Sequence, residues 1–344
     1  MFFRRPNVPE QMDAALVSSF DSPDGLQVVP TAVGKPGPGE VLVRMAYAPI
    51  HPADLVSLRG RYGAVAPLPF VPGLEGSGTV IRSGGGLAGR ALVGRRVAVL
   101  AFSTAQGTWA PYLVVPASHC VPLSSGVSLA RGATLLINPL TAMGLLEPEL
   151  HAHRSVLVTV AAGALGRMIL AWGQHNGLHM IGCVHREAQR EALKKSGHAE
   201  IFNAAAPEFP AQLRILCRRY QIHCALDATG GPLVGQLLSH LEEPGRVVVY
   251  GLLSRESAPL PGFPIIFRDV AVSGFWLQRW WAGRSLIERL RRAVTIQMKP
   301  EIFDSPVQAK VPLASIREAI GLAVRNRSEG KVLLRLDPEL DDTE

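Results

Sequence analysis

One stretch, Ser155–Gly177 (SVLVTVAAGALGRMILAWGQHNG), constrains the fold of this chain more than any other. It begins with an apolar, Val-rich run that is typical of a parallel strand covered on both faces. The turn Ala161–Gly166 (AAGALG) then fits the pattern G-x-G-x-x-G with Ala in its first position, and helix-forming residues follow it. Small residues let such a backbone approach a pyrophosphate, and the helix start offers free N–H groups. The stretch therefore predicts a dinucleotide site, although packing alone also produces such turns.

The residues around this turn repeat its alternation of strand and helix. The strands are predicted at 155–161, 179–184, 199–203, 223–228, 246–251 and 270–276, and the helices at 164–175, 187–196, 207–220 and 232–241. Short apolar strands joined by helical crossovers build a doubly wound parallel sheet, so we expect an α/β fold. This alternation is stronger evidence for a dinucleotide fold than the turn alone.

The first third and the tail have a different character. Short apolar or alternating runs between Pro- and Gly-rich turns predict mostly β structure, with a short helix near Ala53–Leu58. The tail predicts a helix over 283–298, a strand VQAKVP, a helix over Leu313–Asn326 and a closing strand GKVLLRL. We therefore expect a discontinuous β-rich domain over 1–135 and 305–344, and a cofactor domain over 136–304.

Composition limits the class of protein. Of the 344 residues, 47% are hydrophobic and 18% are charged, which suits a folded α/β protein and argues against disorder. No apolar run approaches the roughly 18 residues of a membrane span, and the start MFFRRPNVPEQMD lacks the apolar core of a signal peptide. We expect a cytoplasmic protein, with the mitochondrial matrix as the alternative if a transit peptide precedes this sequence. The four cysteines have no framework spacing and are expected to be buried free thiols.

The net charge of +7 does not by itself predict a nucleic-acid partner, because the basic residues are scattered rather than striped with aromatics. The densest patch, Arg284–Arg292 (RSLIERLRR), predicts the exposed face of an amphipathic helix. The alternative is that this patch attracts an anionic substrate, such as a coenzyme A or carrier-protein thioester.

The residues after the second predicted strand indicate which cofactor is used. His185 and Arg186 follow MIGCV, where an NAD-preferring site places a carboxylate for the ribose 2′-OH. A guanidinium at this point can bind a 2′-phosphate through paired hydrogen bonds. The sequence therefore favours NADPH over NADH. Glu187 would favour NADH, but it also suits the first turn of a helix.

A β-rich first domain, a central dinucleotide fold and a C-terminal return to β structure resemble the medium-chain dehydrogenase/reductase superfamily over essentially the whole chain. The resemblance implies a GroES-like β-rich catalytic domain beside the cofactor domain. The segment PIHPADLVSLRGRYG…PLPFVPGLEGSGTV is similar to the zinc-free branch. Zinc-dependent members carry a Cys near His51, a Gly-His-Glu in place of Gly73–Glu75, and usually four Cys near 90–115, where this chain has none. We therefore expect no metal at His51, Asp54 and Glu75.

Within that branch, the chain resembles the mitochondrial-type 2-enoyl thioester reductases. The strings that carry this likeness are RGRYG, QGTW at 106–109, INPLTA at 137–142, VVVYGLL at 247–253 and SGFWLQRWW at 273–281. Two features depart from it: the AAGALG turn is similar to that of quinone oxidoreductases, and many relatives have Asn in place of His51. The resemblance also implies a homodimer that forms through the apolar edge strand Val270–Trp276.

The resemblance assigns roles to individual residues. Tyr62, in the loop Gly60–Gly63, matches the catalytic Tyr of the group, although a loop Tyr can equally serve packing. The positions that match cofactor contacts are Asn138, Ala162, Gly163, Ala164, Leu165, His185, Arg186, Glu187, Tyr250, Gly251, Leu252, Leu253, Phe275, Trp276, Leu277, Gln278 and Lys331. Gly166 completes the turn that contains Ala162–Leu165. Thr141 lies close to Asn138 in the sequence and is expected to contact the cofactor as well; for Asn138 and Thr141 the alternative is a capped helix start. His51, Asp54 and Trp276 are expected at the substrate pocket, with bracing of the short helix as the alternative for Asp54.

The resemblance implies an NADPH-dependent reductase of trans-2-enoyl thioesters of coenzyme A or a carrier protein. Hydride goes from the cofactor to Cβ and a proton goes to Cα. A phenol with a pKa of about 10 stays protonated at neutral pH, so Tyr62 can both hydrogen-bond an enolate and donate a proton. The alternatives are an NADPH:quinone oxidoreductase or alkene reductase, and a non-catalytic NADPH-binding sensor.

Overall fold

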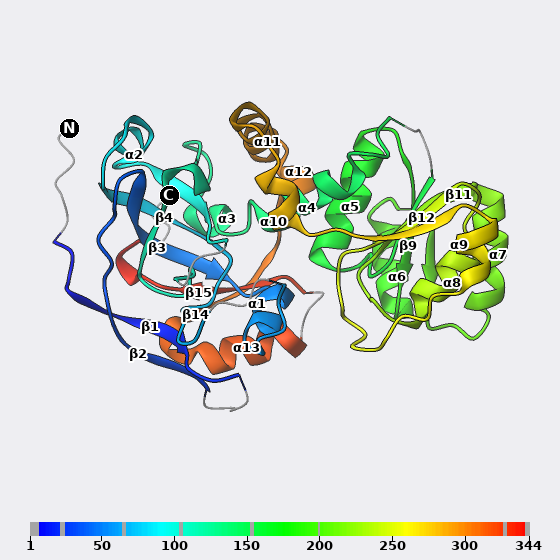
Figure 1. Ribbon diagram of the computed structural model, residues 1–344, viewed down its shortest axis with the longest axis horizontal. Coiled ribbons are helices and arrows are strands. Elements are labelled where there is room, and N and C mark those ends of the chain that lie inside the picture. Colours follow the sequence, from blue (N-terminus) through cyan, green and yellow to red (C-terminus); the bar gives the residue numbers. More distant parts are fainter. Residues whose placement is uncertain are drawn as a thin grey trace. The chain divides into compact units, whose positions relative to one another are not determined.

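The computed structural model describes residues 7–20, 25–63, 67–102, 106–151, 155–198, 200–325 and 329–340 (Figure 1). The chain forms two compact units. Unit 1 contains Met1–Ile137 and Leu286–Glu344, and unit 2 contains Asn138–Ser285. Residues 286–304, which the sequence boundary assigned to the cofactor domain, belong to unit 1 in this division.

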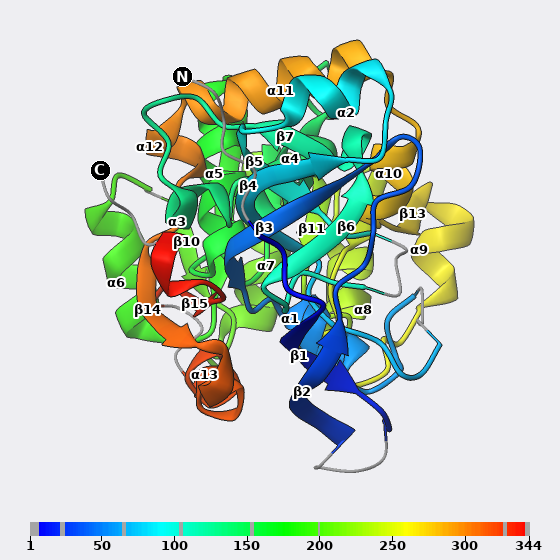
Figure 2. The ribbon, with the colours of Figure 1, turned by 90° about the vertical axis from the view of Figure 1, so that its left-hand side faces the viewer.

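Unit 1 is built on a mainly antiparallel sheet with the order β14-β15-β3-β4-β5-β7, in which β6 also pairs with β3. The strands are β3 (Glu40–Pro49), β4 (Glu75–Ser83), β5 (Arg96–Leu100), β6 (Tyr112–Pro116), β7 (Cys120–Pro122), β14 (Val307–Pro312) and β15 (Lys331–Arg335). β15 runs antiparallel to β3, with Leu333 opposite Pro49. A strand from the end of the chain therefore completes a sheet that begins near its start (Figure 2).

Smaller elements surround this sheet. They are the hairpin β1 (Gln11–Val17) and β2 (Leu26–Ala32), the helices α1 (Pro52–Ser57), α2 (Leu87–Leu92), α3 (Leu129–Gly132), α11 (Leu286–Met298), α12 (Pro300–Phe303) and α13 (Ile316–Arg325), and the 3-10 turns η2 (Ala117–His119), η3 (Leu313–Ser315) and η4 (Pro338–Leu340). Trp109 is fully buried in the core, and its Nε1 donates to the Pro49 carbonyl over 3.3 Å. The side chain of Trp109 therefore serves packing.

Unit 2 contains the predicted doubly wound sheet. Its strands are β8 (Ser155–Val158), β9 (His179–Val184), β10 (Ile201–Asn203), β11 (Ile222–Asp227), β12 (Gly245–Val249) and β13 (Val270–Gly274). All pairings are parallel, and the order is β10-β9-β8-β11-β12-β13. β8, the first strand of unit 2, lies in the middle, and the order reverses beside it, as in dinucleotide-binding folds. The predicted fold class is confirmed.

The helices of unit 2 are α4 (Ile137–Leu146, which begins at the last residue of unit 1), α5 (Ala164–His175), α6 (Glu187–Lys195), α7 (Phe209–Tyr220), α8 (Pro232–His240), α9 (Gly262–Phe267) and α10 (Leu277–Ala282). The prediction of α5 to α8 is confirmed. α9 and α10 were not predicted, because each has only six residues and so gives a short periodic pattern. β13 ends at Gly274, so Trp276 does not end this strand as expected but directly precedes α10.

Two expectations from composition are met. All four cysteines are free and buried, and burial raises the pKa of Cys120, Cys217 and Cys224 to about 12. Most of the patch Arg284–Arg292 forms the first part of the amphipathic helix α11. The exposed side of this helix also carries Leu286 and Leu290. No helix in the described part of the chain is long and apolar enough to cross a bilayer.

Candidate functional site

The turn from β8 into α5 is shaped by a close approach of helix and strand. Val160 has a left-handed backbone (φ 54°), and the Ala161 N–H donates to the Cys183 carbonyl of β9 over 2.9 Å. A Cβ atom on Gly166 would lie 2.5 Å from the Val160 oxygen and 2.7 Å from the Ala161 Cα, so only glycine fits there. This is the packing that the last glycine of the dinucleotide pattern provides. Gly163 caps the N-terminus of α5, so the amides of Ala164 and Leu165 stand at the free end of the helix.

The predicted 2′-phosphate residues lie on the surface at the carboxyl end of β9. His185, Arg186 and Glu187 are exposed. Arg186 directly precedes α6, and Glu187 opens this helix and pairs with Arg190 over 2.7 Å. Glu187 is therefore a first-turn residue, the alternative that the sequence left open for it. A cavity of about 230 Å³ adjoins these residues and is lined by Glu187, Arg190, Phe202 and Asn203 among others.

A buried carboxylate at the end of β11 fixes the neighbouring loops. Asp227 is fully buried and accepts hydrogen bonds from the Thr159 hydroxyl (2.9 Å), the Thr229 hydroxyl (2.9 Å) and the Gly230 N–H (2.7 Å). The Tyr250 N–H donates to the Asp227 carbonyl over 2.8 Å. Burial, together with the negative charge of Asp227, raises the pKa of Tyr250. The sequence did not point to Asp227, because a single Asp at a strand end is common.

The remaining predicted residues of unit 2 lie on α4 and after β12 and β13. Asn138 and Thr141 are the second and fifth residues of α4 and are 6% and 7% exposed, so they do not cap this helix. Tyr250, Gly251 and Leu253 are half-buried after β12, whereas Leu252 is 66% exposed. Of the residues after β13, Leu277 is buried and Phe275, Trp276 and Gln278 are half-buried. The Phe275 ring packs on α4 at Gly144, where an added Cβ would lie 2.7 Å from it.

Unit 1 contains a buried polar cluster, which we define as His51, Asp54, Glu75 and Lys331. Each of these residues is at most 7% exposed. The His51 ring lies between Glu75 and Lys331: its Nε2 is 2.5 Å from Glu75 Oε1, and its Nδ1 is 2.9 Å from Lys331 Nζ. Three of the predicted site residues are thus brought together, and Glu75 is added to them.

Glu75 holds this cluster to the backbone. Its second oxygen, Oε2, accepts hydrogen bonds from the N–H groups of Leu136 (3.1 Å) and Ile137 (2.9 Å), where α4 begins. A carboxylate is well suited to this position because it accepts from the otherwise unpaired amides of a helix start. In the sequence, Glu75 stood out only as a possible metal ligand, and no local pattern indicated this role.

Asp54 braces the start of α1. Its Oδ2 accepts from the His51 N–H over 2.7 Å, which is the bracing alternative stated for it above. Its Oδ1 is buried and has no hydrogen-bond partner within the described residues. Burial is the main reason that the pKa of Asp54 is raised to about 6, while the nearby His51 and Lys331 lower it. Burial likewise lowers the pKa of Lys331 to about 8, against the opposing charges of Glu75 and Asp54.

Tyr62 lies in the loop that follows α1 and is half-buried. The loop begins at Gly60, whose φ of 62° and close contact with the Phe20 ring (2.9 Å from an added Cβ) require glycine. Residues 64–66, which come after Gly63, lie outside the described residues. It is in the same unit as the buried polar cluster.

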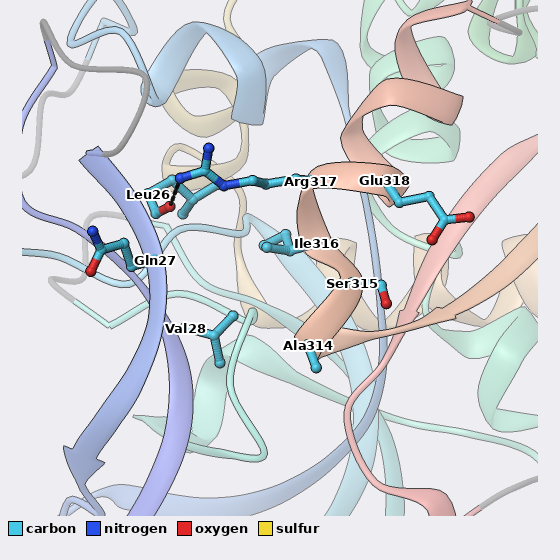
Figure 3. Close-up of a pocket in the computed structure, with 8 residues that line it drawn as sticks. All are labelled: Leu26, Gln27, Val28, Ala314, Ser315, Ile316, Arg317 and Glu318. Carbon is cyan, nitrogen blue, oxygen red and sulfur yellow. Dashed lines mark hydrogen bonds between the residues drawn. The ribbon is translucent and has the colours of Figure 1, made fainter.

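A second cavity, in unit 1, is lined by none of the predicted site residues. It has a volume of about 510 Å³ and lies between β2 and the start of α13 (Figure 3). Its lining is Leu26, Gln27, Val28, Ala314, Ser315, Ile316, Arg317 and Glu318. The Arg317 guanidinium donates to the Leu26 carbonyl across it over 3.4 Å.

Comparison with protein families and known proteins gives consistent matches. Residues 37–125 match the alcohol dehydrogenase GroES-like domain, and residues 164–293 match the zinc-binding dehydrogenase model. The mitochondrial enoyl-acyl-carrier-protein reductase of Caenorhabditis elegans is 30% identical over 265 residues, which are 75% of each chain. The protein of that name from Arabidopsis thaliana is 29% identical over 70% of this chain and 65% of its own length.

Solved structures share the whole fold. A structure from Mesorhizobium loti has 29% identity and a TM-score of 0.88 over 96% of this chain and all of its own. The quinone oxidoreductase of Thermus thermophilus, solved also in complex with NADPH, has 27% identity and a TM-score of 0.76 over 94% of this chain and all of its own.

The description of the second family model implies zinc, but the residues of this chain do not fit it. Both ring nitrogens of His51 are engaged, one by a carboxylate and one by the Lys331 ammonium. All four cysteines are buried free thiols with raised pKa values rather than thiolates. Within the described residues, no group of three His, Cys, Asp or Glu side chains is arranged to hold a metal ion. We derive no step through zinc.

The topology, the glycine turn and the relatives agree. The β-rich unit matches a GroES-like domain, and the parallel sheet has the strand order and the glycine turn of a dinucleotide site. The relatives are reductases and oxidoreductases by name. The chain therefore belongs to the medium-chain dehydrogenase/reductase superfamily and is a nicotinamide-dependent oxidoreductase.

Proposed function

We propose that the chain is an NADPH-dependent reductase of the C2=C3 double bond of trans-2-enoyl thioesters, carried by coenzyme A or an acyl carrier protein. The observation that carries this proposal is the likeness to enoyl-acyl-carrier-protein reductases, which extends over 65–86% of their length in the first three relatives. The resemblance of the Tyr62 loop to the same group supports it.

The choice of NADPH rests on the surface at the end of β9. Arg186 is exposed there, and its neighbour Glu187 is engaged by Arg190. A guanidinium can bind a 2′-phosphate, whereas a paired carboxylate is less available to a ribose hydroxyl. The complex of the Thermus thermophilus enzyme with NADPH agrees with this choice.

The reaction can be divided between the cofactor and the residues of this chain. Bound nicotinamide supplies the hydride. The turn Ala161–Gly166 and the N-terminus of α5 bind the pyrophosphate, and Arg186 binds the 2′-phosphate. The Tyr62 phenol donates a hydrogen bond to the thioester oxygen as negative charge develops on it, and then supplies the proton to Cα.

A second function, NADPH:quinone or alkene reduction, is supported by a specific observation. The Thermus thermophilus quinone oxidoreductase shares the whole fold at 27% identity, and the AAGALG turn resembles that of such enzymes. This function needs the same cofactor residues but no thioester site.

Oxidation of NADPH with crotonyl-coenzyme A, a quinone and a simple enone, measured side by side, tests the proposal. We expect the highest kcat/KM with the thioester. A preference of about tenfold or more for the quinone would replace the proposed function by the second one. Binding of NADPH without turnover of any of the three would indicate a sensor.

A further inference from the structure

Helix α11 turns its apolar side to solvent. Five large apolar residues of this helix are 51–74% exposed: Leu286, Ile287, Leu290, Val294 and Met298. Residues four apart lie one turn above another on a helix, so these side chains form one row about 20 Å long, which we call the α11 stripe. Amphipathic helices on protein surfaces normally turn such a row to the core. The α11 stripe is therefore an apolar surface that is left for a partner to cover.

Contacts with unit 1 hold α11 in this orientation. Ala293 and Ile296 are buried and lie on the inner side of the helix. The Gln297 side chain anchors the helix to the end of β7: its Nε2 donates to the Pro122 carbonyl over 3.2 Å, and its Oε1 accepts from the Ser124 N–H over 2.8 Å. Rotation of α11 to bury the stripe would break both hydrogen bonds and expose the two buried side chains. The stripe is therefore held outward.

The helix is basic as well as apolar. It contains three arginines, Arg289, Arg291 and Arg292, and one acidic residue, Glu288. Arg291 is exposed, as the stripe is. Two copies of α11 packed on each other would bring like charges together, which disfavours a second copy of this chain as the partner. An acidic partner that also offers apolar side chains is complementary to both properties of the helix.

The two thioester carriers of the proposed function differ in how they match the stripe. Coenzyme A is charged and polar, so it would leave the five apolar side chains in water. An acyl carrier protein is a small acidic helical protein, which can cover them with its own apolar side chains. The small size of the stripe suits a partner that leaves after each turnover, because interfaces below about 1,200 Å² are typical of transient encounters. An anionic membrane is disfavoured, because α11 has none of the Trp or Phe anchors common on helices that lie in a membrane surface.

We propose that the α11 stripe, with Arg291 beside it, docks an acyl carrier protein that delivers the enoyl thioester. The proposal rests on the proposed function and narrows its substrate to the protein-bound thioester. The test variants are Leu290→Gln and Val294→Gln, which remove apolar surface with a residue that tolerates helices well, and Arg291→Glu. The matched controls are Val324→Gln and Arg325→Glu at exposed positions of α13, which lies on the opposite side of unit 1 from α11 in both views (Figure 1 and Figure 2).

Kinetics with two carriers of the same acyl group measure the docking. Leu290→Gln and Val294→Gln should each lower kcat/KM for crotonyl-acyl carrier protein by about tenfold, as the loss of a buried apolar contact does, and leave kcat/KM for crotonyl-coenzyme A unchanged. Arg291→Glu should lower the first value severalfold at low salt and less at high salt, because salt screens the attraction between charges. The two α13 controls should change neither value. Fluorescence anisotropy of labelled acyl carrier protein without an acyl group should show the same losses in affinity, with no reaction involved.

The outcomes separate this proposal from the proposed function. Equal losses for both carriers, or no loss for either, would overturn the docking site. A lower mass of Leu290→Gln in light scattering would assign the stripe to a second copy of the chain, and binding to phosphatidylserine vesicles that this variant alone loses would assign it to a membrane; either result overturns the proposal. If the wild type reduces crotonyl-coenzyme A but does not bind the carrier protein, the docking fails and the proposed function stands. If it reduces no thioester, the proposed function fails, while the anisotropy measurement still decides the docking.

Discussion

At the scale of single residues, the proposed enoyl reductase function depends on Tyr62. Replacing Tyr62 by Phe keeps the ring but removes its hydroxyl, so in the proposed reaction the enolate loses both its hydrogen-bond donor and its proton source. We expect Tyr62→Phe to lower kcat by about tenfold or more. Steady-state kinetics with crotonyl-coenzyme A and an NADPH titration measure this, and the dissociation constant of NADPH should be unchanged. A Phe variant with full activity would remove Tyr62 from the mechanism.

Arg186 carries the prediction of cofactor preference. Its side chain is exposed directly before α6, and a guanidinium there favours a 2′-phosphate. Arg186→Ala should raise the KM for NADPH severalfold and leave that for NADH almost unchanged. Arg190→Ala is a useful comparison, because Arg190 forms an ion pair with Glu187 and its removal leaves the Glu187 carboxylate without this ion pair. Equal effects of Arg186→Ala on both cofactors would contradict the assignment.

Asp54 gives a pH dependence whose sign follows from its raised pKa. The folded state binds this proton up to a pH of about 6, whereas the unfolded state releases it near 3.8. The contribution of Asp54 to stability is therefore greatest below 3.8 and is lost as the pH rises to 6, by an amount on the order of 3 kcal/mol.

The prediction concerns the difference between two proteins. The free energy of unfolding is measured by urea denaturation for the wild type and for Asp54→Asn. The wild-type value minus the Asp54→Asn value should decrease between pH 4 and pH 7, because only the wild type loses the stabilising proton of Asp54. A difference that does not change with pH would show that Asp54 titrates normally in the folded protein.

At the scale of elements, the close packing of α5 on the end of β8 makes Gly166 irreplaceable. An Ala at this position would place its Cβ 2.5 Å from the Val160 oxygen. We expect Gly166→Ala to cost about 1–3 kcal/mol of stability, as overpacking does, and to weaken NADPH binding. Gly163→Ala is the matched control for stability, because its Cβ would lie 3.4 Å from the nearest atom. Thermal unfolding of both variants checks this, and equal melting temperatures would be inconsistent with the packing argument.

The sequence predicted most elements but not the elements that lack a periodic pattern. The strands of the parallel sheet were predicted because each is a short apolar run, and the helices α5 to α8 because their apolar residues recur at helical spacing. α4 was seen only as a capped helix start, because every residue from Asn138 to Leu146 is buried and the helix has no polar face. The role of Glu75 depends on contacts 61 and 62 residues away in the sequence. No local pattern can indicate such contacts.

The same distinction applies to the candidate site. The glycine turn and the residues after β9 are local features, so their positions follow from the sequence. The meeting of His51, Glu75 and Lys331 requires the pairing of β15 with β3 and of β3 with β4. Lys331 and His51 lie 280 residues apart, and only the resemblance to a family had singled out Lys331.

At the scale of the whole molecule, the edge of the parallel sheet predicts self-association. β13 is the last strand of the sheet, and all its residues except Val270 are exposed. The neighbouring helix α9 exposes Phe263, Ile266 and Phe267 by 66–70%. An uncovered edge strand beside such side chains favours pairing with a second copy.

We therefore expect a homodimer at micromolar concentration and a shift to monomer when Val272 is replaced by Lys. Light scattering coupled to gel filtration measures both masses. Ile215→Lys, on the exposed side of α7, is the control and should leave the mass unchanged. A monomeric wild type would argue against association through this edge.

The return of the chain to its first sheet has a consequence for synthesis on the ribosome. The strands of unit 2 lie between residues 155 and 274, so its sheet can form while the chain is still growing. Unit 1 lacks β14 and β15 until residue 335 has emerged. Until then, residues 47–49 of β3 lack their partner strand, and Lys331 has not yet joined His51, Asp54 and Glu75. The part of the chain that is made first is thus completed last, and its sheet keeps an unpaired strand edge until the end of synthesis.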